Sequence, residues 1–331
     1  GSNEKYRIYE YISGFTGSDI SCIDSLPKSK AEIFVSPFDN KDFIGEAYSS
    51  DVDSRTRAFL KIQDGCDYNC SYCTIPMARG NSRSLPMDKV IENAEKIIDA
   101  GYKEIILTGV NIGDYKIDGK NRFYELLQNL DKLNIGRIRI SSIEPNLLTD
   151  EILALVENSE RIVHHFHIPL QSGDNEVLRL MRRRYKRELY QELVYKIKSR
   201  LPDSCIGADV IVGFPGETAE CFESSYEFIK GLPINYLHVF SYSERPKTHS
   251  VDIQGKVNGN DIKYRSRILR NLSVSKRSEF YAGNEGKIQE VLFESEEKGM
   301  IEGWTRNYIR VKSDYLKEKE NNIYLVKIKK S

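Results

Sequence analysis

The chain has 331 residues, with 49 basic and 49 acidic side chains, so its formal net charge is zero. Balanced charge excludes a globally basic protein that binds nucleic acid over its whole surface. A hydrophobic share of 40% excludes wholesale disorder, and no apolar run reaches the roughly 20 residues of a membrane-spanning helix.

In chain order, residues 1–57 are expected to be the remnant of an N-terminal domain and a polar connector, because Gly1-Ser2 resembles a cleavage scar. Residues 58–260 alternate apolar strands with amphipathic helices. We expect strands at residues 58–62, 104–108, 137–141, 163–169, 205–212 and 236–242. We expect helices at 88–100, 123–133, 148–157, 175–183, 187–201 and 218–230. Six strands joined by helical crossovers predict an α/β fold, an open (β/α)6 partial barrel with right-handed connections.

The last two parts differ in character. Residues 261–282 predict a polar linker helix, and residues 283–331 predict four short strands that form a small all-β barrel. Such barrels often bind nucleic acid. Basic runs at residues 182–187 and 263–277 are weak support for an RNA surface, because most such runs are merely solvated.

Three cysteines lie close together, Cys66, Cys70 and Cys73, with the spacing C-x3-C-x2-C. A structural zinc takes four protein ligands, as does an all-cysteine iron–sulfur cube, and no further Cys or His lies within about ten residues. Three ligands leave one iron of a [4Fe-4S] cluster open to a small molecule, and this spacing resembles that of enzymes in which the open iron chelates S-adenosylmethionine (SAM). Tyr72, directly before the last cysteine, belongs to the same pattern. The alternative is a zinc loop or three buried thiols.

Seven motifs in order resemble the radical SAM methylthiotransferases. They are the cysteine loop with its continuation to residue 84, and segments 108–111, 139–145, 167–173, 181–185, 209–217 and 238–243. Residues 303–311 are similar to the TRAM domain, which closes these enzymes and binds tRNA. Around the cysteines, the chain is most similar to the branch that acts on N6-threonylcarbamoyladenosine beside the tRNA anticodon.

The resemblance implies a [4Fe-4S] cluster on Cys66, Cys70 and Cys73 that is reduced by an external electron donor and cleaves SAM to a 5′-deoxyadenosyl radical. The radical takes the hydrogen from C2 of the adenine. Sulfur from a sulfur donor is inserted there, with a methyl group from a second SAM. The expected partners are these donors and the anticodon stem-loop of tRNA, with no membrane. Scattered thiols without a secretory signal predict a cytoplasmic protein.

The resemblance also implies roles at the strand ends. Backbone acceptors of Thr108, Gly109 and Asn111 are expected to meet the methionine amino group of SAM. Ser142 and Glu144 are expected at the ribose hydroxyls, where a carboxylate accepts well. The alternative is that Glu144 caps a helix together with Ser142.

Two further SAM contacts follow from position. Gln171 and Arg183 are candidates for the SAM carboxylate, since arginine suits bidentate capture. Ile211, Val212 and Gly213 are candidates for the adenine wall. The alternative for Arg183 is a solvated basic run.

Two features depart from the family. Its second cluster needs three cysteines before the barrel, and only Cys22 precedes Cys66 here. We therefore expect that cluster only in a full-length protein, and SAM binding and cleavage alone from this chain. Residues 247–250 also differ from the family pattern. The histidines are expected to be structural, because nothing in the sequence completes a metal set around them: His164, His165, His167 and His238.

Other functions remain open. The same chemistry on isopentenyladenosine in tRNA, or on a ribosomal-protein aspartate, is the nearest alternative. A non-catalytic RNA-binding protein with a zinc loop is a different class, and metal content separates it from an iron–sulfur enzyme.

Overall fold

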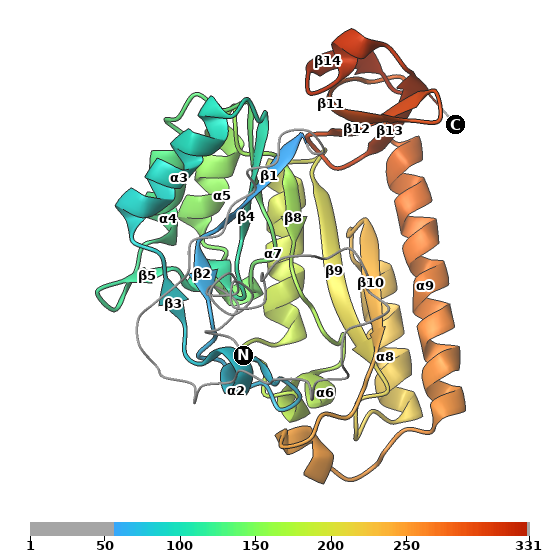
Figure 1. Cartoon of the computed structure of the whole chain (residues 1–331). Helices are drawn as coiled ribbons and strands as arrows, with labels where there is room; N and C mark the ends of the chain where they lie inside the picture. The colour runs from blue at the N-terminus through green and yellow to red at the C-terminus, as the bar shows by residue number, and fades with distance from the viewer. Residues whose placement is uncertain (1–55, 330–331) are drawn as a thin grey trace, which may run out of the picture.

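The computed structural model describes residues 56–329, and the expected N-terminal remnant lies almost wholly outside them. Six parallel strands confirm the predicted partial barrel (Figure 1). They are β1 (Arg57–Lys61), β4 (Glu104–Thr108), β7 (Arg137–Ile140), β8 (His165–His167), β9 (Cys205–Val212) and β10 (Tyr236–Ser241). Hydrogen bonds join β1-β4-β7 and β8-β9-β10, and parallel bridges at Ile138–Ile162 and Ser142–His167 link β7 to the β8 segment.

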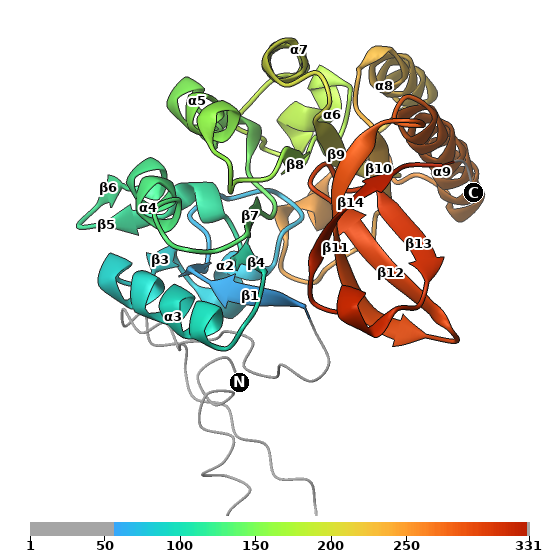
Figure 2. The same ribbon diagram turned by 90° about the horizontal axis from the view of Figure 1, so that it is seen from above.

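Helices cover the outer face of the crescent (Figure 2). They are α3 (Met87–Asp99), α4 (Phe123–Leu130), α5 (Asp150–Asn158), α7 (Arg187–Arg200) and α8 (Ala219–Gly231). Their apolar sides share one core with alternate strand residues such as Leu60 and Val210. Side chains of Thr149 and Thr218 accept bonds from backbone N–H groups and so begin α5 and α8.

The shorter α6 (Asn175–Leu180) ends before the predicted residue 183. Arg182 adopts a left-handed conformation with φ of 57°, which a helix cannot continue. The chain therefore turns at Arg182, and Arg183 is brought into the interior instead of lying on a helix surface.

Small elements connect the larger ones. They are β2 (Gln63–Asp64), α2 (Ile75–Arg79), β3 (Arg83–Ser84), β5 (Lys116–Ile117) and β6 (Lys120–Asn121). Single 3₁₀ turns lie at Ile112–Asp114, Pro145–Leu147, His249–Asp252 and Lys317–Lys319. None of the helices within residues 56–329 has the length and apolarity to cross a membrane.

The expected polar linker is α9 (Gly259–Ala282), and it does more than link. It lies along β10 at the end of the crescent (Figure 1). Two cations of its basic run are buried: Arg265 bonds to the Glu217 carboxylate at 2.6 Å, and the Lys276 ammonium bonds to two backbone carbonyls. These cations stabilise the fold, so only part of this run remains for an RNA surface.

The C-terminal part is antiparallel, as predicted. Its strands are β11 (Ile288–Glu297), β12 (Met300–Thr305), β13 (Arg310–Asp314) and β14 (Ile323–Lys327), in the order β13-β12-β11-β14. They curve into a half-barrel around Val291, Phe293 and Ile301.

This C-terminal domain sits on the amino ends of the barrel strands (Figure 1). The fully buried Arg137 of β7 donates bonds of 2.8 and 2.9 Å to the carbonyls of Trp304 and Glu290. Tyr308, from the turn after β12, stacks on His165 with ring centroids 4.1 Å apart. The domain therefore closes the floor of the barrel, and the opposite end stays free for a site.

Candidate functional site

The cysteine loop lies between β2 and α2, at the carboxyl ends of the strands (Figure 1). Its backbone is held by contacts from distant segments. Ser71 receives a bond from Ser250 at 2.8 Å and donates one to Met181 at 3.1 Å. Residues 247–250, the segment that departs from the family pattern, thus pack directly against the cysteine loop.

Each cysteine sulfur accepts a hydrogen bond from an N–H group. The backbone N–H groups of Tyr68 and Ile75 lie 3.4 Å from the sulfurs of Cys66 and Cys73. The third sulfur, on Cys70, is 3.2 Å from a guanidinium nitrogen of Arg183. Donors to sulfur favour the electron-rich thiolate, so these three side chains fit a cluster bound through thiolates.

Burial works against free thiolates in this loop. It raises the pKa of Cys66 to about 11 and also raises that of Cys73, so both are neutral thiols without a bound cation. Metal ions reverse this preference because they coordinate the deprotonated sulfur.

Arg183 pairs with Glu144 at this site, and both side chains are largely buried. The interpretation of Arg183 as part of a solvated run is therefore wrong. The alternative role of Glu144 as a helix cap is wrong too, since its side chain makes no capping bond to the 3₁₀ turn that it precedes. The pair brings two predicted SAM contacts together next to Cys70.

The turn after β4 is fixed by one buried glutamine. The side-chain oxygen of Gln63 accepts from the N–H groups of Val110 and Asn111 at 2.9 and 2.8 Å. Its nitrogen donates to the Gly65 carbonyl at 2.8 Å, directly before the first cysteine. Gly109 is required here, because a Cβ would lie 2.9 Å from the Gln63 carbonyl oxygen.

The Asn111 side chain is 4% exposed, yet both its amide atoms lack a hydrogen-bond partner among residues 56–329. Leaving buried polar atoms unpaired is costly unless a ligand or water satisfies them. This orphaned amide at a strand end fits a polar ligand such as the methionine end of SAM.

The three residues predicted to line the adenine differ in where their side chains and backbone groups point. Ile211 lies on the inner face of β9 and packs in one cluster with Tyr72 and Phe214. Val212 points its side chain into the main core, so only its backbone faces the site. The N–H of Gly213 donates to Glu217 at 2.6 Å and is not free for a ligand.

Gln171 and Ser142 lie beside the same inner face. Gln171 has a left-handed φ of 66°, and its N–H bonds to the Asp209 carbonyl at 2.8 Å. Ser142 pairs with His167 across the junction of the two sheets. Both therefore flank the inner strands where the sequence places SAM.

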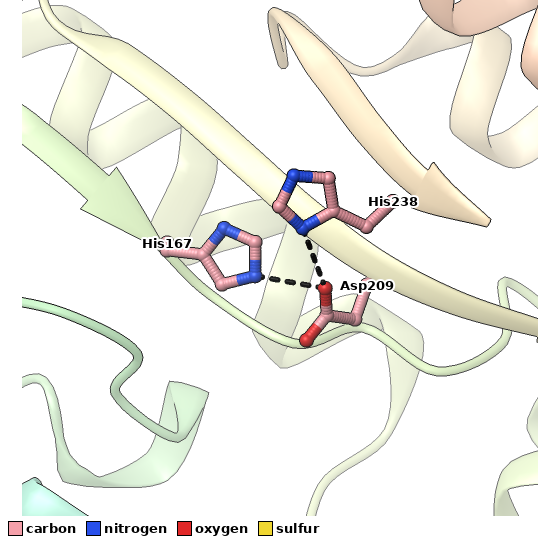
Figure 3. Close-up of side chains that lie close together, drawn as sticks. All are labelled: His167, Asp209 and His238. Atoms are coloured by element: carbon pink, nitrogen blue, oxygen red, sulfur yellow. Dashed lines mark hydrogen bonds and ion pairs between the residues drawn. The ribbon is translucent and has the colours of Figure 1, made fainter. Parts of the chain in front are cut away.

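A polar group missed by sequence reasoning lies deeper in the barrel. One oxygen of Asp209 is 2.8 Å from the Nε2 of His167 and 3.3 Å from the Nδ1 of His238 (Figure 3). The expectation that nothing completes a metal set around these histidines is thus wrong, since their ligand atoms and that of Asp209 lie within 4.8 Å of one another. We call these residues the His–Asp–His cluster. The three side chains come from three adjacent strands that are distant in sequence, so no local sequence pattern marks this cluster.

The other two histidines are placed structurally. His165 is fully enclosed between the Tyr236 hydroxyl, 2.9 Å away, and the Tyr308 ring. Burial holds the pKa of His165 well below its ordinary value, so it stays neutral. His164 is half-buried, and burial also lowers its pKa.

Comparisons with known proteins agree with this geometry. Residues 60–229 match the model of the radical SAM superfamily. In structure, the chain resembles a radical S-adenosylmethionine methyltransferase, TsrM, from Kitasatospora setae, with a TM-score of 0.50 and 17% identity over 58% of this chain and 38% of that one. That likeness shows the fold, and the chain belongs to the radical SAM superfamily.

Within the superfamily, the relatives are methylthiotransferases. The chain is 42% identical to the threonylcarbamoyladenosine tRNA methylthiotransferases MtaB of Bacillus subtilis and Aquifex aeolicus, over 84% and 79% of its length. It is 32% identical to the MtaB of Thermotoga maritima over 99% of its own length and 73% of that protein. The chain therefore belongs to the radical SAM methylthiotransferase family. It spans 63% of the length of the first two relatives.

Proposed function

We propose that this chain is the radical SAM part of a cytoplasmic tRNA methylthiotransferase. Its substrate is N6-threonylcarbamoyladenosine beside the anticodon, which receives sulfur and a methyl group at C2. The observation that carries the proposal is the loop of three cysteines, each with an N–H donor to sulfur, in a chain 42% identical to two enzymes named for this substrate.

Cys66, Cys70 and Cys73 would hold a [4Fe-4S] cluster, which supplies the electron that cleaves SAM. The chain's own residues bind SAM and orient it. The Asn111 amide and the turn that Gln63 fixes bind the methionine end of SAM. Ile211, in its cluster with Tyr72, gives the adenine an apolar wall that excludes water.

The Glu144–Arg183 ion pair places a carboxylate and a guanidinium next to the cysteine loop. Arg183 bonds to both Glu144 and the Cys70 sulfur, so it fixes the carboxylate for the ribose hydroxyls and holds the loop in one position. The C-terminal half-barrel, similar to TRAM, is the proposed contact for the anticodon stem-loop. An electron donor and a sulfur donor complete the partners.

The test is SAM cleavage by the reconstituted chain. Protein loaded anaerobically with iron and sulfide and reduced with dithionite is expected to release 5′-deoxyadenosine from SAM. Cys70→Ala is expected to lose the cluster absorbance and the product. Cys221→Ala, a half-buried thiol outside the loop, is the matched control and keeps both.

A fully loaded wild-type protein that forms no 5′-deoxyadenosine would contradict the proposed SAM chemistry. Zinc without sulfide in the freshly purified protein would instead support the zinc-loop alternative. SAM cleavage that tRNA does not stimulate, by a protein that does not bind tRNA, would refute the proposed substrate. The proposed radical chemistry would remain.

A further inference from the structure

The His–Asp–His cluster lies on the inner face of the partial barrel. His238 and Asp209 are direct partners in the parallel register of β10 and β9 (Figure 3). The neighbours of Asp209 along β9, Ala208 and Val210, are buried in the core beneath the helices. Because side chains alternate along a strand, Asp209 faces the concave interior instead.

The cluster is one layer of side chains away from the predicted SAM contacts. His167 pairs with Ser142, and the Asp209 carbonyl accepts from the N–H of Gln171. Ile211 is two residues beyond Asp209 on the same face of β9, about 7 Å along the strand. The cluster therefore lies on the same inner face as the predicted SAM contacts, next to the space between them and the floor of the barrel.

The cluster keeps hydrogen-bonding capacity for a ligand. Both imidazoles approach Oδ1 of Asp209, and within residues 56–329 no partner is bonded to its Oδ2. His238 is 52% exposed, and its Nε2 likewise has no partner in the described part of the chain. His167 is fixed from behind by the Tyr236 hydroxyl at 3.2 Å. Burial would raise the pKa of Asp209, but the two histidines hold it below its ordinary value, so the carboxylate stays charged.

An exposed aromatic ring lies between the cluster and the SAM end. Phe240 follows His238 by two residues on β10, so it shares the inner face, and it is 51% exposed. Proteins that bind unstacked RNA bases commonly place them on such rings. A base stacked on Phe240 would have its edge within reach of His238 and Asp209.

We propose that the His–Asp–His cluster is the binding site for a polar substituent on N6 of the substrate adenine. Asp209 Oδ2 accepts from an N–H or O–H group of the substituent, and His238 Nε2 bonds to a second polar atom. This inference rests on the proposed function. A threonylcarbamoyl group offers urea N–H groups and a hydroxyl, whereas a hydrocarbon substituent offers neither and would leave Oδ2 of the charged Asp209 without a partner in the interior.

A divalent metal is the other occupant that two histidines and a carboxylate suggest. The geometry favours the organic group, because the potential ligand atoms are already bonded to one another. The half-exposed His238 and the nearby Phe240 also provide a surface, which a closed metal site would not need.

The test compares two anticodon stem-loops by fluorescence anisotropy, one with N6-threonylcarbamoyladenosine and one with unmodified adenosine, in the presence of SAM. We expect wild type to bind the modified RNA more tightly. His238→Asn keeps a donor near Asp209 but removes Nε2, and we expect it to lose roughly tenfold in that preference. We expect Asp209→Asn to lose at least as much. Affinity for the unmodified RNA should change less than about twofold in both.

The matched control is His164→Asn, the same substitution at a histidine on the outer side of the barrel, beside α5. It is expected to keep the wild-type preference, and circular dichroism checks that all variants fold. A wild-type preference that survives in both His238→Asn and Asp209→Asn overturns this inference alone. A wild-type protein without preference overturns the proposed substrate as well.

Metal content gives the remaining outcome. A variant with Cys66, Cys70 and Cys73 all replaced by alanine is expected to carry no zinc after dialysis against zinc. One equivalent of zinc that is lost on His238→Asn would overturn the inference, because the cluster would then be a metal site.

Discussion

Gln63 gives the sharpest test of how the site is assembled. It is fully buried, and its side-chain amide joins the cysteine loop to the turn after β4. Gln63→Leu preserves the approximate volume but removes the acceptor for the N–H groups of Val110 and Asn111. Each buried N–H left unpaired costs about 1–3 kcal/mol. With some relaxation of the turn, we expect the free energy of unfolding to fall by about 3 kcal/mol.

The assay is urea unfolding of the metal-free protein, followed by far-UV circular dichroism. Hydrogen exchange should show faster exchange at Val110 and Asn111 than in wild type, which localises the effect. Gln191→Leu, on the exposed face of α7, is the matched control and is expected to change stability by less than about 0.5 kcal/mol. A loss below about 1 kcal/mol for Gln63→Leu, with unchanged exchange at both amides, would refute this account of the turn.

Three further predictions concern charged groups. Arg137→Met should lower the unfolding free energy by about 3 kcal/mol, because it removes two bonds to the C-terminal domain, and the chain's one tryptophan reports this by fluorescence. Burial would raise the pKa of Glu104, but Arg139 outweighs burial and lowers it from 4.5. The stability from Glu104 is thus present above about pH 4.5 and lost as the pH falls. Glu104→Gln should therefore make the unfolding free energy depend less on pH in the acid range. An unchanged pH dependence would contradict this. Arg183→Leu removes a donor to the Cys70 sulfur and should lower the midpoint potential of the reconstituted cluster in an EPR-monitored titration, whereas an equal midpoint would show that the bond does not tune it.

The strands were predictable where side-chain patterning is strong. The bounds of β4 and β9 match the expected residues 104–108 and 205–212, because buried apolar runs end at polar or glycine residues there. β8 is shorter than expected, His165–His167 against residues 163–169, because Val163 and Ile168 on its flanks make only single backbone hydrogen bonds to neighbouring strands, to Ile138 and Gly207. The strand propensity of these residues does not predict such partial pairing.

The site was predictable in composition but less so in contacts. Cysteine spacing is local in sequence, so Cys66, Cys70 and Cys73 could be proposed as cluster ligands from the sequence directly. The burial of Arg183 depends on the left-handed Arg182, which no residue preference announces. The His–Asp–His cluster depends on the register of three strands that are distant in sequence. Register is a tertiary property, so one sequence by itself could not reveal this cluster.

The long helix α9 has a mechanical consequence. Near its start, Arg265 is bonded to Glu217, which also holds the N–H of Gly213 at the site end of β9. Its end meets the C-terminal half-barrel, and its 24 residues span about 36 Å. Because both ends of α9 are anchored and its middle packs along β10, the helix is a rigid connection of fixed length. The half-barrel is therefore held at a fixed distance from the cysteine loop. A molecule that binds to both must be long enough to span that distance.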